Sequence, residues 1–429
     1  MKINVFWFRR DLRLDDNSAL INALAEGIPV LSVFIFDTSI IDELPEDDPR
    51  ISFIYDTLLN INNELLKYGS SLLILKGEPE GVWRKLALSY DIKSVFVNKD
   101  YEPYSISRDL KIKNILGEKG ILLIAFKDQV IFEETEILKS DKNPYTIFTP
   151  YKNRWLQKIS GTHLLNPDPK KRGKQNYFKC TFPFPTPGEL GFKKSILKVR
   201  SFDLTAIVEY DKYRNYPSMD RTTYLGPHLR FGTISIRKIV QLAIKENPVF
   251  LNELIWREFF MHILFNFPRV VTENFRSKYD NVPWRNNEME FDKWCNGQTG
   301  YPLVDAGMRQ LNETGYMHNR VRMITSGFLC KHLLIDWRWG EAYFATKLLD
   351  YELSSNNGNW QWAAGTGCDA APYFRVFNPA AQLHKFDRDK IYVRKWIEDI
   401  AGPGYPKPVV DHDFARERAI SVYKSGIKK

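Results

Sequence analysis

Residues 3–36 read INVFWFRRDLRLDDNSALINALAEGIPVLSVFIF, and this stretch decides the fold of the first part of the chain. Ile3–Phe8 and Val30–Phe36 are nearly continuous apolar runs, which is typical of strands in a parallel sheet that is buried on both faces. Ser18–Ala25, between these two runs, has a helical pattern. A strand, a helix and a second strand in this order predict a βαβ unit.

The same alternation of strands and helices continues to about residue 130. We expect further strands at Ser71–Leu75, Ser94–Val97 and Ile121–Phe126, and helices at Ile51–Tyr68, Trp83–Tyr90 and Ser105–Leu116. Residues 1–130 are therefore predicted to form a doubly wound α/β domain with a parallel sheet. They lack the G-x-G-x-x-G dinucleotide fingerprint, so a ligand of this half must be held in another way.

The composition of the chain changes after this region. The segment from about Gly161 to Lys194 is rich in Pro, Lys and Gly, which indicates a connector without regular structure. After Ser201 the pattern is helical, with a clear 3.6-residue period in Leu251–Phe265 and Asn319–Leu334. We predict an α/β domain over residues 1–130, a connector over residues 131–200 and an all-helical domain over residues 201–429.

Length and composition describe a globular protein of two domains. The 429 residues are too many for one ordinary core, and 44% are hydrophobic while 26% are charged. No apolar run reaches the roughly 20 residues of a membrane helix, and the first residues do not form a signal peptide. We therefore expect a cytoplasmic monomer that does not contact a membrane.

Charge and aromatic content point to the class of ligand. The net charge of +9 favours a polyanionic partner, although basic proteins without such a partner are common. The 11 Trp, 21 Tyr and 28 Phe residues suit a flat ligand or stacked bases. The 4 Cys residues are scattered without the spacing of a zinc site, so we expect free thiols and no metal.

Three functional side chains are expected on one helix face in LNELIWREFF. Glu253, Trp256 and Arg257 stand at i, i+3 and i+4, so they share a face. A carboxylate, an indole and a guanidinium on one stripe are poor core material, because buried charges need partners. The stripe could line a site, or it could be a surface ion pair beside a half-buried Trp, and spacing alone favours the second interpretation.

The segment MHNRVRMITSGF has the same spacing. It places Asn319, Arg322 and Met323 on one helix face, where an amide and a thioether could line a pocket for a flat heteroaromatic group. The alternative is a helix capped near Asn319 with Met323 in the core. The spacing does not decide between these two interpretations.

The segment LLDYELSSNNGNWQWAAGTG is the most informative. Gly358 and the Asn and Ser residues around it weaken a helix, yet Trp360 and Trp362 follow at once. On a helix these two rings differ by about 200° and point in opposite directions. Asn356 lies one turn before Trp360 and shares its side. Packing in a core explains one of these Trp residues easily and the pair poorly.

The segment DRTTYLGPHLRFG offers hydroxyl groups and a glycine before a helical stretch. Backbone N–H groups and Thr hydroxyls at the start of a helix can bind phosphate. An ordinary N-cap is the commoner explanation for any one such segment.

Taken together, these segments resemble the DNA photolyase and cryptochrome family, and most closely its class I photolyases for cyclobutane pyrimidine dimers. The resemblance extends along almost the whole chain, through FWFRRDLRLDDNSAL, FTPYKNRW, NELIWREF, TGYPLVDAGMRQL, GYMHNRVRMITSGFL, NNGNWQWAAGTG and DAAPYFRVFNP. It implies an α/β half, a long connector and a helical half that holds FAD. It also implies repair of dimers in damaged DNA, by electron transfer from light-excited reduced FAD to a dimer flipped out of the duplex.

The resemblance assigns expected roles to individual residues. The residues expected to bind FAD are Tyr210, Thr222, Thr223, Tyr224, Leu225, Gly226, Asp350, Tyr351, Glu352 and Asn356. The residues expected on the side of the dimer and the DNA are Arg214, Glu253, Trp256, Arg257, Asn319, Arg320, Met323, Trp362 and Gln382. The residues expected to act in catalysis are Glu253, Asn356 and an electron-transfer chain of Trp360, Trp337 and Trp284.

Some positions depart from the family pattern. Gly226 stands where the phosphate loop usually has a hydroxyl, Glu352 replaces the second Asp of a D-x-D pair, and Phe250 stands where an indole is common. Tyr104 and Ser105 occupy positions where folate binders carry Asn and Glu. A second, antenna chromophore therefore stays open between a reduced folate and a deazaflavin.

Other functions within and outside the family are less well supported by the residues. A (6-4) photolyase would carry a histidine pair where this chain has Gly315–Asn319. A cryptochrome photoreceptor of the plant type often has Asp at the position of Asn356, together with a long C-terminal tail. A flavoprotein with no photochemistry has no substrate motif here to support it.

Overall fold

The structure is a computed structural model that describes residues 1–164, 176–398, 400 and 402–427. The chain forms two compact units, which do not follow the consecutive domains expected from composition. The first unit comprises residues 1–136, 155–202 and 224–245, and the second comprises residues 137–154, 203–223 and 246–429. The predicted connector over residues 131–200 is thus shared between the two units, and its residues 165–175 lie outside the described residues.

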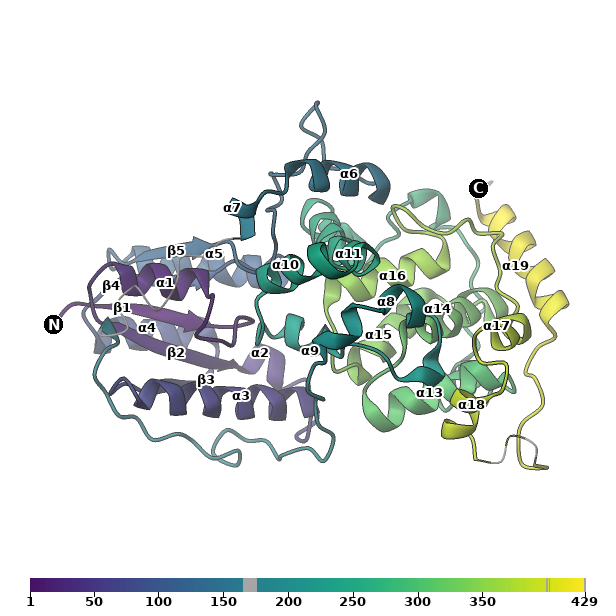
Figure 1. Cartoon of the computed structure of the whole chain (residues 1–429), viewed down its shortest axis with the longest axis horizontal. Helices are drawn as coiled ribbons and strands as arrows, with labels where there is room; N and C mark the ends of the chain where they lie inside the picture. The colour runs from purple at the N-terminus through teal and green to yellow at the C-terminus, as the bar shows by residue number, and fades with distance from the viewer. Residues whose placement is uncertain (165–175, 399, 401, 428–429) are drawn as a thin grey trace. The chain divides into compact units, whose positions relative to one another are not determined.

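The first unit is built on a parallel sheet of five strands in the order β3-β2-β1-β4-β5 (Figure 1). The strands are β1 (Ile3–Phe8), β2 (Val30–Asp37), β3 (Leu72–Gly77), β4 (Ile92–Asn98) and β5 (Leu122–Phe126). β1 and β2 are buried along their whole length, whereas the edge strands β3 and β5 are partly exposed. The prediction of a parallel α/β fold from continuous apolar runs is therefore confirmed.

Helices alternate with these strands as the sequence predicts. They are α1 (Ser18–Ala25), α2 (Thr38–Ile41), α3 (Pro49–Leu66), α4 (Pro79–Ser89) and α5 (Pro103–Gly117), followed by the later α7 (Gly161–Leu164), α9 (Leu225–Arg230) and α10 (Ile236–Glu246). α3, α4 and α5 each begin with a proline in the first turn, where the missing N–H costs no hydrogen bond. This explains why α4 begins four residues before the expected Trp83.

Residues 224–245 belong to the first unit, although the sequence places them in the helical domain. The physical reason is a buried ion-pair network. Arg237 of α10 pairs with Asp128 at 2.8 Å and with Asp16 at 3.2 Å, and Arg13 pairs with Asp128 at 2.6 Å. Contacts between residues so far apart in the chain leave no signal in local composition.

The second unit is helical. Its helices are α8 (Tyr210–Tyr213), α11 (Pro248–Asn266), α12 (Glu288–Cys295), α13 (Pro302–Thr314), α14 (Asn319–Gly327), α15 (Trp337–Lys347), α16 (Leu353–Ala364), α17 (Pro379–Phe386), α18 (Ile391–Trp396) and α19 (His412–Ile427). The helix α6 (Phe148–Lys158) begins in this unit and ends in the first. None of the described helices is both long and apolar enough to cross a membrane.

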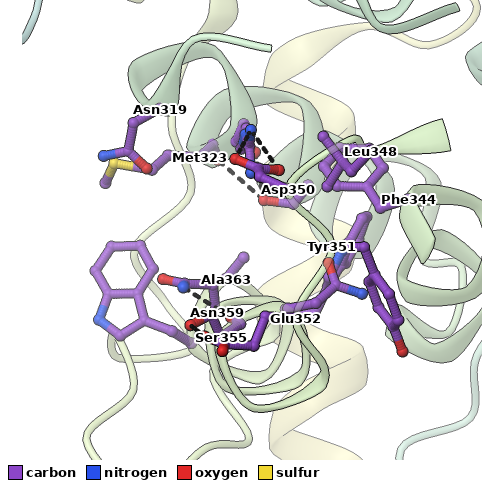
Figure 2. Close-up of a pocket in the computed structure, with 15 residues that line it drawn as sticks. Asn319, Met323, Phe344, Leu348, Asp350, Tyr351, Glu352, Ser355, Asn359 and Ala363 are labelled. Carbon is purple, nitrogen blue, oxygen red and sulfur yellow. Dashed lines mark hydrogen bonds and ion pairs between the residues drawn. The ribbon is translucent and has the colours of Figure 1, made fainter. Parts of the chain in front are cut away.

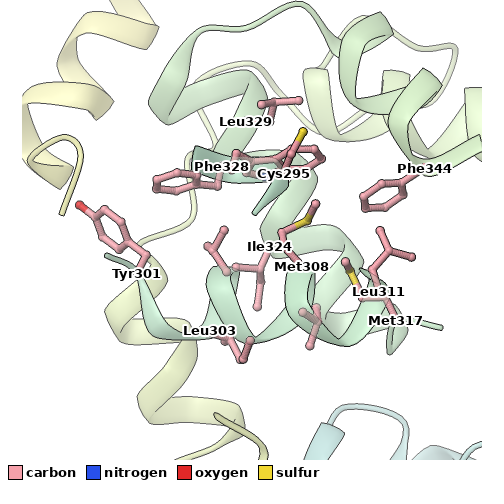
Figure 3. Packing of buried hydrophobic residues seen from close by; sticks show 14 of the residues in the cluster. Cys295, Tyr301, Leu303, Met308, Leu311, Met317, Ile324, Phe328, Leu329 and Phe344 are labelled. Atoms are coloured by element: carbon pink, nitrogen blue, oxygen red, sulfur yellow. The ribbon is translucent and has the colours of Figure 1, made fainter. Parts of the chain in front are cut away.

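The core of the second unit lies between α12, α13, α14 and α15 (Figure 3). Met308 and Leu311 of α13 pack with Ile324 of α14 in this core. α13 and α14 approach closely at Gly307, where a Cβ atom would come within 2.3 Å of Val321. This core fixes the helices that carry the site.

Two helices differ from their expected form. The segment Asn319–Leu334, which has one helical period in the sequence, forms α14 followed by a π-helical turn, Phe328–Leu333. α16 is continuous through Gly358, although Gly weakens an isolated helix. A Cβ atom at Gly358 would meet the Phe260 ring at 2.2 Å, so the glycine allows α16 to lie close to α11.

Candidate functional site

The stripe on α11 lines a cavity. Asn247 caps the helix by accepting from the N–H groups of Val249 and Phe250, and this fixes where the helix begins. Glu253, Trp256 and Arg257, which follow on one face, all line a cavity of about 260 Å³. The expectation of one shared face is met, and the half-buried stripe is not an ordinary surface.

Charged side chains meet in pairs around this cavity. Arg214 Nη1 lies 2.8 Å from Glu253 Oε1, and Arg257 Nη2 lies 3.2 Å from Glu352 Oε1. Burial raises the pKa of the Glu253 carboxyl above its ordinary value, and the Arg214 guanidinium partly opposes that rise. Glu253 therefore takes up a proton more readily than an exposed glutamate.

Asn319 and Met323 extend from α14 to the same region (Figure 2). Both line the cavity of the α11 stripe and a second, smaller cavity of about 100 Å³. Arg322 on the same helix holds Asp350 with two contacts from Nη2, at 3.1 and 2.9 Å. The two carboxylates Asp350 and Glu352 are thus both paired with arginine at the wall of the smaller cavity.

The two cavities are neighbours that share part of their lining. The shared residues are Asn319, Met323, Ser355, Asn359 and Trp362. We call the smaller one the carboxylate pocket, because Asp350 and Glu352 line it, and the larger one the tryptophan pocket, because Trp256 and Trp362 line it.

α16 supplies side chains to both pockets. Trp360 is only 2% exposed and packs on Phe344 with ring centroids 4.9 Å apart. Trp362 is half-buried and lines both pockets. The opposite orientation expected for these two rings thus gives one core ring and one pocket ring, although Trp360 also reaches the wall of the carboxylate pocket.

The side chain of Asn356, one turn before Trp360, is held by hydrogen bonds to Glu341. Its Nδ2 donates to the backbone oxygen of Glu341 at 3.0 Å and to Glu341 Oε1 at 2.9 Å. Because these bonds occupy the amide N–H groups, the amide oxygen is left as the group that can serve the pocket. Nothing in the spacing of the sequence identified Glu341, which lies on a different helix, α15.

The other residues expected to bind the cofactor lie in several places. Tyr351 lines the carboxylate pocket, and Tyr210 makes an edge contact with Phe250 at 5.0 Å. The phosphate loop is divided, since Thr222 and Thr223 belong to the second unit and Tyr224, Leu225 and Gly226 belong to the first. Its role therefore stays a prediction.

The expected electron-transfer chain lies within the second unit. Trp337 is fully buried and donates from Nε1 to Asn274 at 2.9 Å, whereas Trp284 is half-buried. Trp337 and Trp360 belong to one core cluster, and Trp284 packs against that cluster. Gly340, one turn after Trp337, has Trp360 so close that a Cβ atom would lie 2.1 Å from its ring.

The residues expected on the DNA side include a group of arginines. Arg320 donates to Asn215 at 2.6 Å and stacks on Phe386 at 4.5 Å. Burial lowers its pKa, and the positive charges of Arg214 and Arg375 lower it further. Three arginines that repel one another suit an anion, and Arg375 is a member that spacing did not identify.

Three more residues singled out in the sequence lie on α17 and α5. Gln382 is half-buried on α17. Tyr104 and Ser105, at the positions where folate binders carry Asn and Glu, are hydrogen-bonded within the first unit to Asp37 at 2.5 Å and to Asp100 at 3.1 Å. The second chromophore therefore stays open.

None of the cysteines, all of which lie in the described part of the chain, lines the carboxylate pocket or the tryptophan pocket. Cys180, Cys295, Cys330 and Cys368 are free thiols, and the last three are buried. Among the described residues no group of His, Cys, Asp and Glu is arranged to hold a metal ion.

Comparison with known proteins gives matches over both units. Residues 4–171 match the family model for DNA photolyase, and residues 250–403 match the model for the FAD binding domain of DNA photolyase. A deoxyribodipyrimidine photo-lyase of Synechococcus is 34% identical over 464 residues, which cover 98% of this chain and 96% of that protein.

Solved structures are similar along the whole chain. A class III photolyase from Agrobacterium tumefaciens superposes with a TM-score of 0.90 at 33% identity, covering 100% of this chain and 98% of the other. An archaeal photolyase from Sulfolobus tokodaii, described with two FAD molecules, superposes with a TM-score of 0.85 at 36% identity, covering 99% of this chain and 100% of the other.

Proposed function

This chain belongs to the DNA photolyase family, and from that premise we propose that it repairs cyclobutane pyrimidine dimers in DNA with light absorbed by FAD. One observation supports this proposal above the others. The tryptophan pocket, with an indole on each of two helices, adjoins a polar carboxylate pocket and shares part of its lining. A stacked pair of bases and a flat cofactor with a polar edge could then lie next to each other.

The residues of the carboxylate pocket fit the flavin ring of FAD. Asp350 and Glu352 offer acceptors for ring N–H groups, and the Asn356 amide oxygen offers another. Each carboxylate is paired with arginine, so the pocket does not present uncompensated negative charge to the cofactor. Bound FAD would supply a light-excitable electron donor, which no side chain can replace.

Glu253 and the two tryptophans would hold the dimer. Trp256 and Trp362 offer ring faces for stacking, worth roughly 1–3 kcal/mol for each base. Burial raises the pKa of Glu253 and so favours its protonated form, in which the carboxyl would donate a hydrogen bond to a base carbonyl. Met323 and Asn319 would complete the wall on the side of α14.

Two arginines and a glutamine would bind the DNA. Arg214, Arg320 and Gln382 would contact the backbone, which provides affinity without sequence preference. Flipping bases of one strand out of the duplex costs a few kcal/mol, and less for a dimer that already pairs poorly. The pocket therefore selects dimers partly through the weakness of the damaged duplex.

Trp360, Trp337 and Trp284 would conduct electrons inward to reduce oxidised FAD. Burial supports Trp284 as the outer end of this chain, since Trp360 and Trp337 are in the core and Trp284 is half-buried. We further propose that the protein acts as a monomer in the cytoplasm, where its substrate is the cell's DNA.

A repair assay tests the proposed function. The purified protein, loaded with FAD and reduced, should restore pyrimidines in a dimer-containing oligonucleotide under blue light and not in the dark. A second oligonucleotide with a (6-4) photoproduct should stay unrepaired. Failure to repair the dimer with FAD bound would favour a photoreceptor, and repair of the (6-4) lesion would change the substrate class.

A further inference from the structure

One face of Trp256 is covered by a second ring. The rings of Trp256 and Phe148 are stacked, with centroids 3.7 Å apart and planes within 8° of parallel. Phe148 is 7% exposed, while Trp256 is half-buried and lines the tryptophan pocket. Because an indole has two faces, a ligand can stack only on the face away from Phe148. Phe260, which also lines the pocket, contacts the same indole with ring centroids 5.3 Å apart.

The surrounding rings hold this stack in place. Phe259 meets the edge of Phe148 at 5.8 Å and of Trp256 at 5.6 Å, both in T-shaped geometry. Isolated aromatic rings prefer offset or edge-to-face contacts over a parallel sandwich. The parallel arrangement is therefore imposed by neighbours, which fix the plane of the indole.

The backbone of Phe148 is itself anchored to the loop that follows α16. Its backbone N–H donates to Asp369 Oδ2 at 3.0 Å. Asp369 lies in the loop that follows α16, the helix that carries Trp362. Trp256 is thus connected through Phe148 and Asp369 to the segment next to Trp362. All these residues belong to the second unit.

We propose that Phe148 and Asp369 are positioning residues that set the plane of Trp256 relative to Trp362, and thereby the preference of the pocket for a pyrimidine dimer over normal bases. This inference rests on the proposed function. Neither residue lines the tryptophan pocket, so both act through Trp256. If the Trp256 ring were free to tilt, the pocket would stay apolar. The ring would, however, no longer be held parallel to a rigid dimer, and the stacking contact would be lost.

The test compares binding to dimer-containing and undamaged oligonucleotides of the same sequence, measured in the dark. We expect Phe148→Leu to lower the ratio of the two affinities by about fivefold or more, the lower end of one stacking contact. Affinity for undamaged DNA should be unchanged, because it depends on arginines and not on stacking. FAD content should be unchanged too.

A matched control is available in the same unit. Phe291 is stacked on Trp294 at 5.8 Å with planes within 18°, and neither ring lines either pocket. Phe291→Leu should lower thermal stability in the same way and leave the affinity ratio unchanged. An equal fall of the ratio in this control would overturn the proposal, because it would show a general loss of packing.

Asp369 provides a second variant if Phe148→Leu does not fold. Asp369→Ala removes the acceptor for the Phe148 N–H group and should lower the ratio, whereas Asp369→Asn keeps an acceptor and should retain it. An unchanged ratio in Asp369→Ala, or in folded Phe148→Leu, contradicts the positioning role. If the parent protein itself shows no preference for dimers, the proposed function fails instead.

Discussion

Charged residues are used in different ways in the two units of this chain. In the first unit Arg13, Asp16, Asp128 and Arg237 form a closed network in which every side chain is 10% exposed or less. Each charge has a charged partner there, and the network joins segments that are far apart in the sequence. The network holds together the segment with Arg13 and Asp16, the segment with Asp128, and α10, which carries Arg237.

Two pairs at the pockets of the second unit are more open. Arg214 and Glu253 have side chains that are 24% and 31% exposed, and Arg322 and Asp350 are 27% and 19% exposed. All four residues line one of the two pockets. A partly hydrated pair can exchange its partner for a ligand, whereas a buried pair loses stability when one member is removed. The structural network is thus buried, whereas two of the pocket pairs are open enough to be available for binding. Arg257 and Glu352, at 13% and 6% exposed, form a third pocket pair that is nearly as closed as the network.

The largest expected effect is loss of flavin photoreduction. It tests whether burial always marks a structural role, because it concerns a buried side chain that we expect to have a function. Trp360 is 2% exposed, yet we expect it to conduct electrons. Trp360→Phe should abolish light-driven reduction of bound oxidised FAD, measured by absorption. The same variant, chemically reduced beforehand, should repair dimers at close to the normal rate. Unimpaired photoreduction would refute the chain, and lost repair would mean that Trp360 lies on the dimer side.

Removing one charge from the buried network should cost stability. Burial raises the pKa of Asp128, but Arg13 and Arg237 outweigh this and hold it below its ordinary 3.8. Asp128→Asn should lower the free energy of unfolding by about 3–5 kcal/mol at neutral pH. The difference in free energy of unfolding between parent and variant should be complete above about pH 4. It should disappear as the pH falls through the lowered pKa of Asp128, where this carboxyl becomes protonated in the parent. A pH-independent difference would show that packing, not charge, is responsible.

A smaller effect is expected from a pocket ring. Trp256→Ala should weaken binding to dimer-containing DNA by about tenfold or more, because a stacking contact is lost. FAD should remain bound, since Trp256 lines only the tryptophan pocket. Equilibrium binding and the flavin absorption spectrum measure the two properties. Loss of FAD or unfolding would instead identify Trp256 as a core residue.

The smallest expected effect is on the salt dependence of DNA binding, and it tests whether a pocket-side arginine, Arg320, is available to bind phosphate. Each phosphate contact contributes about −0.9 to the slope of log affinity against log salt concentration. Arg320→Gln should therefore make that slope shallower by about one, as measured by DNA binding between low and high salt. An unchanged slope, with weaker binding at every salt concentration, would assign Arg320 to packing on Phe386.

Local patterns predicted much of the fold. The expected strand Ile3–Phe8 and helix Ser18–Ala25 have the bounds found in the structure, because apolar runs and helical periods are local signals. The continuity of α16 through Gly358 was not predictable, since it depends on close contact with Phe260 on another helix. The same holds for α10, whose Arg237 pairs with Asp16 and Asp128.

The candidate site was predictable to a similar extent. Helical spacing placed Glu253, Trp256 and Arg257 on one face, and all three line the tryptophan pocket. Spacing could not identify Phe148 or Glu341, because each supports a pocket residue that lies on a different helix. Residues that support a site from behind become visible only when the helices are packed.

Repair by a single flash of light tests the central claim most directly. The reduced, FAD-loaded protein is saturated with dimer-containing oligonucleotide in the dark, and restored pyrimidines are counted after one short blue flash. The account predicts that the number restored rises with the number of bound dimers and is zero without the flash. No restoration after the flash, in protein that holds both reduced FAD and the dimer, would contradict the account.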